Sequence, residues 1–107
     1  MFAHKITDGY KAVMDKVRMK TLVHGDKTLM VEFRLDKGAD LPVHDHPHEQ
    51  TGYLVAGRIT LTIDGRDHDV RPGGSWCIPG GISHAAVAHE DSVALEVFAP
   101  VREDYLP

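Results

Sequence analysis

Residues 38–57, GADLPVHDHPHEQTGYLVAG, place three histidines at alternate positions directly before an apolar run. These histidines are His44, His46 and His48, and Gln50 follows them with the same parity. Side chains alternate faces along an extended chain, so this spacing puts the three imidazoles on one side. Imidazoles that converge in this way are common ligands of a divalent transition metal ion. The stretch therefore predicts a metal site where a strand begins.

Strand signals dominate the chain on both sides of this stretch. Apolar and polar residues alternate in ITLTI, residues 59–63, and the Asp64-Gly65 pair after it is a strong two-residue hairpin signal. Residues 9–16, GYKAVMDK, are the one segment with room for a helical turn. The expected strand runs are 17–25, 28–38, 48–57, 58–65, 66–73, 75–81, 83–89 and 92–100. About eight short strands with regular turn signals predict an all-β single domain over 1–107, a closed barrel or jelly roll.

Composition narrows the class of protein further. A chain of 107 residues holds one core, and its formal charge of −4 without a basic stripe argues against nucleic-acid binding. No apolar run is long enough to cross a membrane, and the N-terminus does not read as a secretory signal, so we expect a cytoplasmic protein. Cys77 is the single cysteine, which excludes an internal disulfide; we expect it to be a small buried apolar residue.

Two spaced motifs resemble those of the cupin superfamily. The pattern G-x5-H-x-H-x3-Q-x6-G over residues 38–57 resembles the first cupin motif. The pattern G-x5-P-x-G-x2-H, which begins the segment 73–88, resembles the second and adds His84. The resemblance implies a cupin β-barrel, also called a double-stranded β-helix or jelly roll, with a metal held inside it.

The resemblance also implies a ligand set of His44, His46, Gln50 and His84 for one divalent transition metal ion. Zinc, nickel, iron and manganese all suit such ligands. The chain departs from the family at two positions, since the usual Glu is Gln50 here and the Asn that often closes the second motif is Ala88. Because a neutral amide leaves the charge of the ion uncompensated by protein ligands, we expect an anionic substrate.

The other histidines have less defined roles. His48 has the parity of a ligand, but the family pattern favours Gln50, which leaves His48 either as a ligand or as a residue that orients its neighbours. The remaining four are expected to be solvated: His4, His24, His68 and His89.

The last predicted strand carries two different rows of side chains. One row is aliphatic and is expected to face a core; the other mixes a carboxylate with an aromatic ring. The first row is Val93, Leu95 and Val97, and the second is Ala94, Glu96 and Phe98. If the second row lines the barrel cavity, Glu96 is a carboxylate in a partly desolvated pocket. The alternative is that Glu96 and Phe98 face solvent.

The runs HPHEQTGYLVAG, IPGGISHAA and EDSVALEVFAPVREDYL are similar to the pectin-degradation (KdgF-type) branch of the cupins. That branch opens unsaturated uronic acids from pectin or alginate, so the resemblance implies a small anionic sugar acid as substrate. Its acidic residue, Phe and Arg are matched here by Glu96, Phe98 and Arg102, although the acid is more often Asp. The alternative for Arg102 is a surface ion pair with Glu103 or Asp104, which contributes little to stability.

The implied reaction converts the cyclic 4,5-unsaturated uronate to its linear ketonised form, 5-keto-4-deoxyuronate. The metal acts as a Lewis acid, and Glu96 carries the proton. Tyr53 and Trp76 are either pocket walls or ordinary core residues, and the family implies a homodimer. Two other functions stay open, a metal-dependent dioxygenase and a non-catalytic small-molecule-binding cupin, because a fold does not determine a function.

Overall fold

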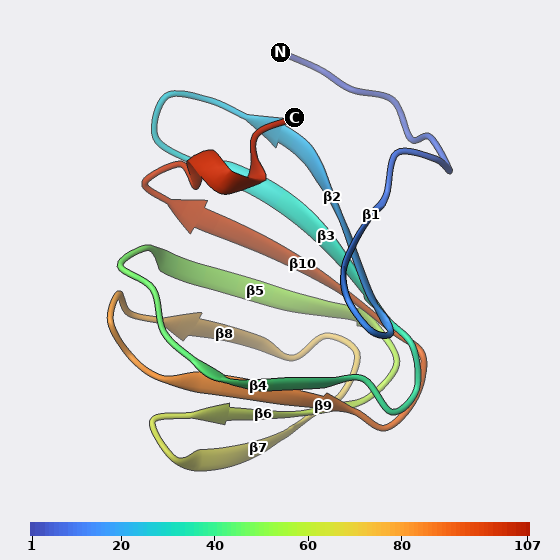
Figure 1. The fold of residues 1–107 in the computed structure, drawn as a ribbon, viewed down its shortest axis with the longest axis vertical. Coiled ribbons are helices and arrows are strands. Elements are labelled where there is room, and N and C mark those ends of the chain that lie inside the picture. The colour runs from blue at the N-terminus through green and yellow to red at the C-terminus, as the bar shows by residue number, and fades with distance from the viewer.

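Ten strands in two antiparallel sheets make up the computed structural model, which describes residues 1–107 (Figure 1). One sheet has the order β1-β2-β3-β10-β5-β8, and the other has the order β4-β9-β6-β7. The elements are β1 (Lys11–Met14), β2 (Val17–His24), β3 (Leu29–Leu35), β4 (Asp40–His44), β5 (Glu49–Ala56), β6 (Ile59–Ile63), β7 (Arg66–Val70), β8 (Ser75–Ile78), β9 (His84–Ala88), β10 (Ser92–Ala99) and the short 3₁₀ helix η1 (Glu103–Tyr105). The predicted all-β jelly roll is confirmed.

The hairpin signals lie where the chain turns. Asp64 and Gly65 join β6 to β7, and both have positive φ, at 50° and 76°. Two positive φ values are what a type I′ turn requires, and this turn matches the right-handed twist of the paired strands. The turn at Gly25-Asp26 likewise separates β2 from β3, which pair antiparallel.

Two strands lie outside the eight that the sequence predicts. The segment that might have held a helical turn forms β1 instead, an edge strand paired with β2. A helix of one or two turns has little stability of its own, whereas β2 offers a row of free hydrogen-bonding groups. The second added strand is β4, which lies between the motif glycine Gly38 and His46 and pairs with β9.

The core lies between the two sheets. Its most deeply buried side chains are Phe98, Leu29, Leu54, Ile78, Val17 and Val31, each under 2% exposed. Strand β10 runs through the middle of the six-stranded sheet, between β3 and β5 (Figure 1). Its residues alternate between buried and half-buried along the whole strand.

The aliphatic row of β10 does not face the core, contrary to expectation. Ala94, Glu96 and Phe98 are buried, whereas the row of Val93, Leu95 and Val97 is half-buried on the outer face. The register explains the choice, because Glu96 is the cross-strand partner of Val31, a fully buried residue of β3. Side chains directly opposite one another share a face of the sheet.

Two further expectations were wrong. Cys77 is exposed, because the fully buried Ile78 beside it in β8 fixes the parity of that short strand. Tyr53 is 48% exposed on the outer face of β5, so it is neither a pocket wall nor a core residue. No helix has the length and apolar character needed to cross a membrane.

Candidate metal centre

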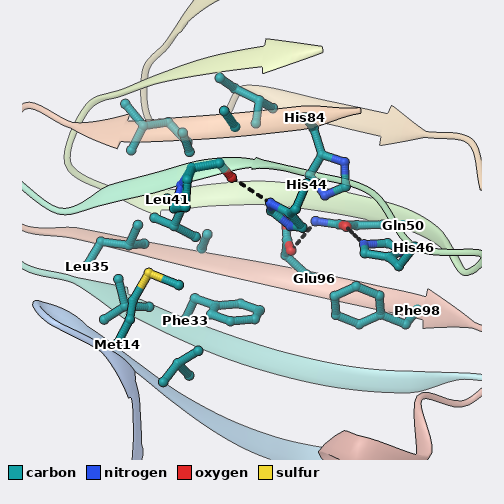
Figure 2. Close-up of a pocket in the computed structure, with 18 of the residues that line it drawn as sticks. Met14, Phe33, Leu35, Leu41, His44, His46, Gln50, His84, Glu96 and Phe98 are labelled. Carbon is teal, nitrogen blue, oxygen red and sulfur yellow. Dashed lines mark hydrogen bonds between the residues drawn. The ribbon is translucent and has the colours of Figure 1, made fainter. Parts of the chain in front are cut away.

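Three histidines from different elements converge at one end of the barrel (Figure 2). His44 ends β4, His84 begins β9, and His46 lies in the loop between β4 and β5. One ring nitrogen from each lies within 4.8 Å of the other two. His44 and His84 are also direct cross-strand partners, with ring centroids 4.2 Å apart. The pairing of β4 with β9 therefore brings together two histidines that are forty residues apart in the sequence.

A tight contact between two turns holds His46 in this group. The Gly81 amide donates a 2.8 Å hydrogen bond to the carbonyl oxygen of His46. A Cβ on Gly80 would lie 2.3 Å from the carbonyl oxygen of Pro47, so this close approach requires glycine. Gly80 and Gly81, in the segment of the second motif, thus hold the loop that carries His46 of the first motif.

The hydrogen bonds of the three rings select one tautomer. In His44, His46 and His84, Nδ1 lies 2.8–3.0 Å from a backbone carbonyl oxygen two residues away along the chain. A carbonyl oxygen only accepts, so Nδ1 carries the hydrogen and Nε2 keeps a free lone pair. Burial lowers the pKa of His46 and His84, which keeps both rings neutral near pH 7. All three rings are thus prepared as ligands.

Two atoms at this point have no suitable partner within the chain, and a cation would satisfy both. Nε2 of His84 is buried without a hydrogen bond. Nε2 of His46 lies 2.9 Å from Oε1 of Gln50, where two lone pairs face each other. Adjacent ligands of one ion lie about 3 Å apart when each bond is about 2.1 Å. His44, His46, Gln50 and His84 therefore fit a divalent transition metal ion.

His48 does not join this group. It is absent from the set of ring nitrogens that converge, and its carbonyl oxygen accepts the hydrogen bond from Nδ1 of His46. His48 thus orients His46 through its backbone, which is the second of the two roles left open for it.

Glu96 lies directly behind the ligand set. The side-chain amide of Gln50 donates to one of its oxygens, and the indole Nε1 of Trp76 donates to the other at 2.9 Å. Only 8% of Glu96 is exposed. Burial raises the pKa of Glu96 to about 7, although the two hydrogen bonds and the charge of Arg102 oppose the increase. The solvent-facing alternative for Glu96 is thus excluded, and the charge of an ion would be partly balanced from behind its ligands.

Phe98 and Arg102 adjoin the histidines on the same side. Phe98 is 1% exposed, and its ring lies 5.7 Å from that of His46. The Arg102 guanidinium lies 5.0 Å from the centroid of Phe98 and pairs with Asp104 through Nε and Nη2. Arg102 thus makes one of the two ion pairs expected as its alternative role. Its side chain is nevertheless only 15% exposed and lines the cavity.

One residue of the site, Tyr105, was not assigned to it from the sequence. Tyr105 lines the cavity and stacks with Arg102, whose guanidinium lies 3.9 Å from its centroid. No pattern in the sequence indicates that η1 folds the tail back over the barrel. Of the two alternatives for Trp76, the structure shows a pocket wall, since Trp76 lines the cavity and its indole contacts Glu96.

These residues surround one cavity of about 270 Å³ between the sheets. The histidines, Gln50 and Glu96 form one end, and apolar side chains such as Met14 and Leu35 form the other (Figure 2). A cavity of this size suits a small molecule, and its few polar groups are concentrated around the candidate ligands.

Comparison with known proteins agrees with this geometry. Residues 31–100 match the cupin domain family. Over 94 residues the chain is 30% identical to the pectin degradation protein KdgF of Dickeya dadantii (strain 3937), covering 86% of each protein. The structure of KdgF from a Halomonas species has a TM-score of 0.88 at 31% identity and 92% coverage of both chains. An RmlC-like cupin from Shewanella frigidimarina has a TM-score of 0.93 at 27% identity, covering 98% of this chain and 95% of that one.

The chain therefore belongs to the cupin family. Within that family it is similar to the pectin degradation protein KdgF over most of its length, in sequence and in structure.

Proposed function

We propose that this cupin uses a divalent transition metal ion to convert cyclic 4,5-unsaturated uronate monosaccharides from pectin or alginate to linear 5-keto-4-deoxyuronate. The observation that carries the proposal is the buried carboxyl group of Glu96, one hydrogen bond behind a neutral ligand set and inside a cavity. A buried, proton-accepting group with a pKa near 7 is typical of a catalytic acid or base. The similarity to KdgF supports the substrate class.

The chemistry needs one proton transfer in each direction and no oxidation. The ring oxygen of the substrate is attached to C5 of the C4=C5 double bond. Glu96 as carboxylate accepts the proton of the anomeric hydroxyl while the bond between C1 and the ring oxygen breaks. C1 becomes an aldehyde and the ring oxygen becomes the oxygen of an enolate; the proton held by Glu96 then passes to C4, which leaves a ketone at C5 and restores the carboxylate. A single residue with a pKa near 7 serves both steps.

Other residues of the site bind and shield the substrate. Nε2 of the three histidines and Oε1 of Gln50 would hold the ion, which when bound supplies Lewis-acid polarisation of substrate oxygens. Arg102 lines the cavity, and its guanidinium is well matched to a substrate carboxylate. The ring of Phe98 keeps water away from the enolate.

An anaerobic spectrophotometric assay tests the proposal. Metal-loaded protein is mixed with unsaturated uronate monomer, and the absorbance of the conjugated C4=C5 bond is followed. We expect it to fall faster than the spontaneous ring opening of a protein-free blank. A rate equal to the blank contradicts the proposal, and consumption of oxygen by the metal-loaded protein would favour a dioxygenase.

We further propose that two copies pair through the outer face of the six-stranded sheet. On that face Leu95 lies beside Tyr53, and Val97 lies beside Met30. Tyr53 and Met30 are 48% and 36% exposed, and Val55 adds a further exposed side chain. Exposed apolar side chains that lie close together are typical of a protein interface. A mass measurement in solution tests the proposal, and a monomeric mass would contradict it.

A further inference from the structure

We propose that Trp76 is a positioning residue for Glu96, and that position 52 is glycine so that the Trp76 indole can reach across β5. The proposal rests on the proposed function in one respect, since Glu96 is taken to be the residue that moves the proton.

The strand register places three residues in one row. Glu96 of β10 is the cross-strand partner of Gly52 in β5, and Gly52 is the partner of Trp76 in β8. Glu96 and Trp76 are therefore separated by a whole strand, which is roughly 9.6 Å of backbone spacing. Nevertheless, Nε1 of Trp76 lies 2.9 Å from Oε1 of Glu96. The indole spans that gap by lying over Gly52.

Gly52 is the residue that leaves this space free. A Cβ built on Gly52 would lie 2.2 Å from both Nε1 and Cε2 of Trp76, far inside contact distance. The backbone at Gly52 does not have the left-handed φ that would itself call for glycine. Glycine inside a strand weakens it and commonly marks a close approach by another group. Here the approaching group is the indole ring that donates to Glu96.

The contact fixes the orientation of the carboxyl group. Trp76 holds Oε1, and the amide of Gln50 holds Oε2, so both oxygens of Glu96 are restrained. A Glu side chain has several rotatable bonds, and a mobile acid must be ordered before it transfers a proton. The indole N–H thus helps to order the side chain of Glu96.

Two substitutions remove this hydrogen bond in different ways. Trp76→Phe keeps an aromatic ring but loses the N–H donor, and Gly52→Ala displaces the indole with a single methyl group. Gly25→Ala is the matched control, because nothing lies within 4 Å of a Cβ at Gly25. We expect both test variants to bind metal like the wild type while kcat for ring opening falls about 10- to 100-fold and KM changes less than about threefold. The control should match the wild type in all three quantities.

A spectroscopic measurement tests the hydrogen bond without reference to activity. Trp76 is the single tryptophan of the chain, so fluorescence spectra excited beyond the absorption band of the three tyrosines report on its indole alone. We expect Gly52→Ala to change these spectra in the same way as Glu96→Ala, because each variant breaks the same bond, and Gly25→Ala to leave them unchanged. Spectra of Gly52→Ala and Glu96→Ala identical to the wild type would overturn the contact.

The two measurements separate the possible failures. A wild-type protein that opens no uronate overturns the proposed function and the kinetic role of Trp76, while the spectra still decide whether the indole holds Glu96. An active wild type with an equally active Trp76→Phe variant overturns the positioning role alone. If Gly52→Ala does not fold, Trp76→Phe still decides the kinetic question.

Discussion

The two faces of strand β10 reverse the usual arrangement of polar and apolar residues. The inner face carries Glu96 in the core, and the outer face carries Leu95 and Val97 toward solvent. Burial of a carboxyl group is unfavourable, and so is exposure of aliphatic side chains. A buried carboxyl group and partly exposed aliphatic side chains on one strand both lower the stability of the isolated chain, so each needs another explanation. We attribute the inner face to a reaction and the outer face to a partner.

The largest effect is expected where the inner face meets the ligand set. His84→Ala removes one of four ligands, together with the buried Nε2 that has no partner in the chain. We expect the affinity for Zn²⁺ or Ni²⁺ to fall more than about 100-fold, since even residues behind metal ligands commonly contribute 10- to 100-fold. Calorimetric titration measures this affinity. His89→Ala is the control, because His89 is exposed and bonds to Thr60. Equal affinities of both variants would contradict the assigned site.

A second prediction concerns the free energy of unfolding of the metal-free protein. The pKa of Glu96 is raised to about 7 from 4.5, so the folded state binds its proton more tightly than the unfolded state. This contribution is fully present below pH 4.5 and is lost as the pH rises to about 7 and above. Glu96→Gln does not titrate, and we therefore expect its stability relative to wild type to increase by about 3 kcal/mol between pH 4 and pH 8.

Urea unfolding of both proteins in the presence of a chelator measures this difference. His46 and His84 titrate in both proteins, so their contributions cancel in the comparison. A constant difference across this pH range would mean that Glu96 is not a buried acid.

A third prediction compares neighbouring residues on opposite faces. Phe98→Leu truncates a fully buried ring and should lower the free energy of unfolding by about 1–2 kcal/mol. Val97→Ala, on the half-buried outer face, should lower it by less than about 1 kcal/mol. Denaturant unfolding at one pH gives both values. A larger loss for Val97→Ala than for Phe98→Leu would mean that the core does not lie against the inner face of β10.

The smallest effect on folding is expected on the outer face. Leu95→Lys places a hydrated ammonium group in the proposed interface, where pairing of two copies would remove it from water. We expect the solution mass to change from dimer to monomer, while the monomer's free energy of unfolding changes by less than about 0.5 kcal/mol. Light scattering after size-exclusion chromatography measures the mass. A variant that keeps the mass of the wild type would exclude this face as the interface.

The features predicted correctly from the sequence are those that depend on local spacing. The Asp64-Gly65 turn needs only two residues with positive φ, and the two cupin motifs are fixed intervals along the chain. The three histidines converge because β4 pairs with β9. The resemblance to the cupin motifs implied the ligand set, although β4 itself was not among the expected strands.

The features missed from the sequence depend on pairing between distant strands. Periodicity separates the two rows of β10, but only the register with β3 decides which row is buried. The same limit explains Cys77, whose strand is too short to show its parity. The contact of Trp76 with Glu96 needs three strands in register and a glycine between them. No interval in the sequence encodes that arrangement.

The most direct test compares Glu96→Ala with Val97→Ala in one assay. Both proteins are loaded with metal, their metal content is measured, and ring opening of unsaturated uronate is followed without oxygen. Per bound metal ion, we expect a rate at least about 100-fold below wild type for Glu96→Ala and a rate within about twofold of wild type for Val97→Ala. A metal-loaded Glu96→Ala protein that opens uronate as fast as the wild type would contradict it.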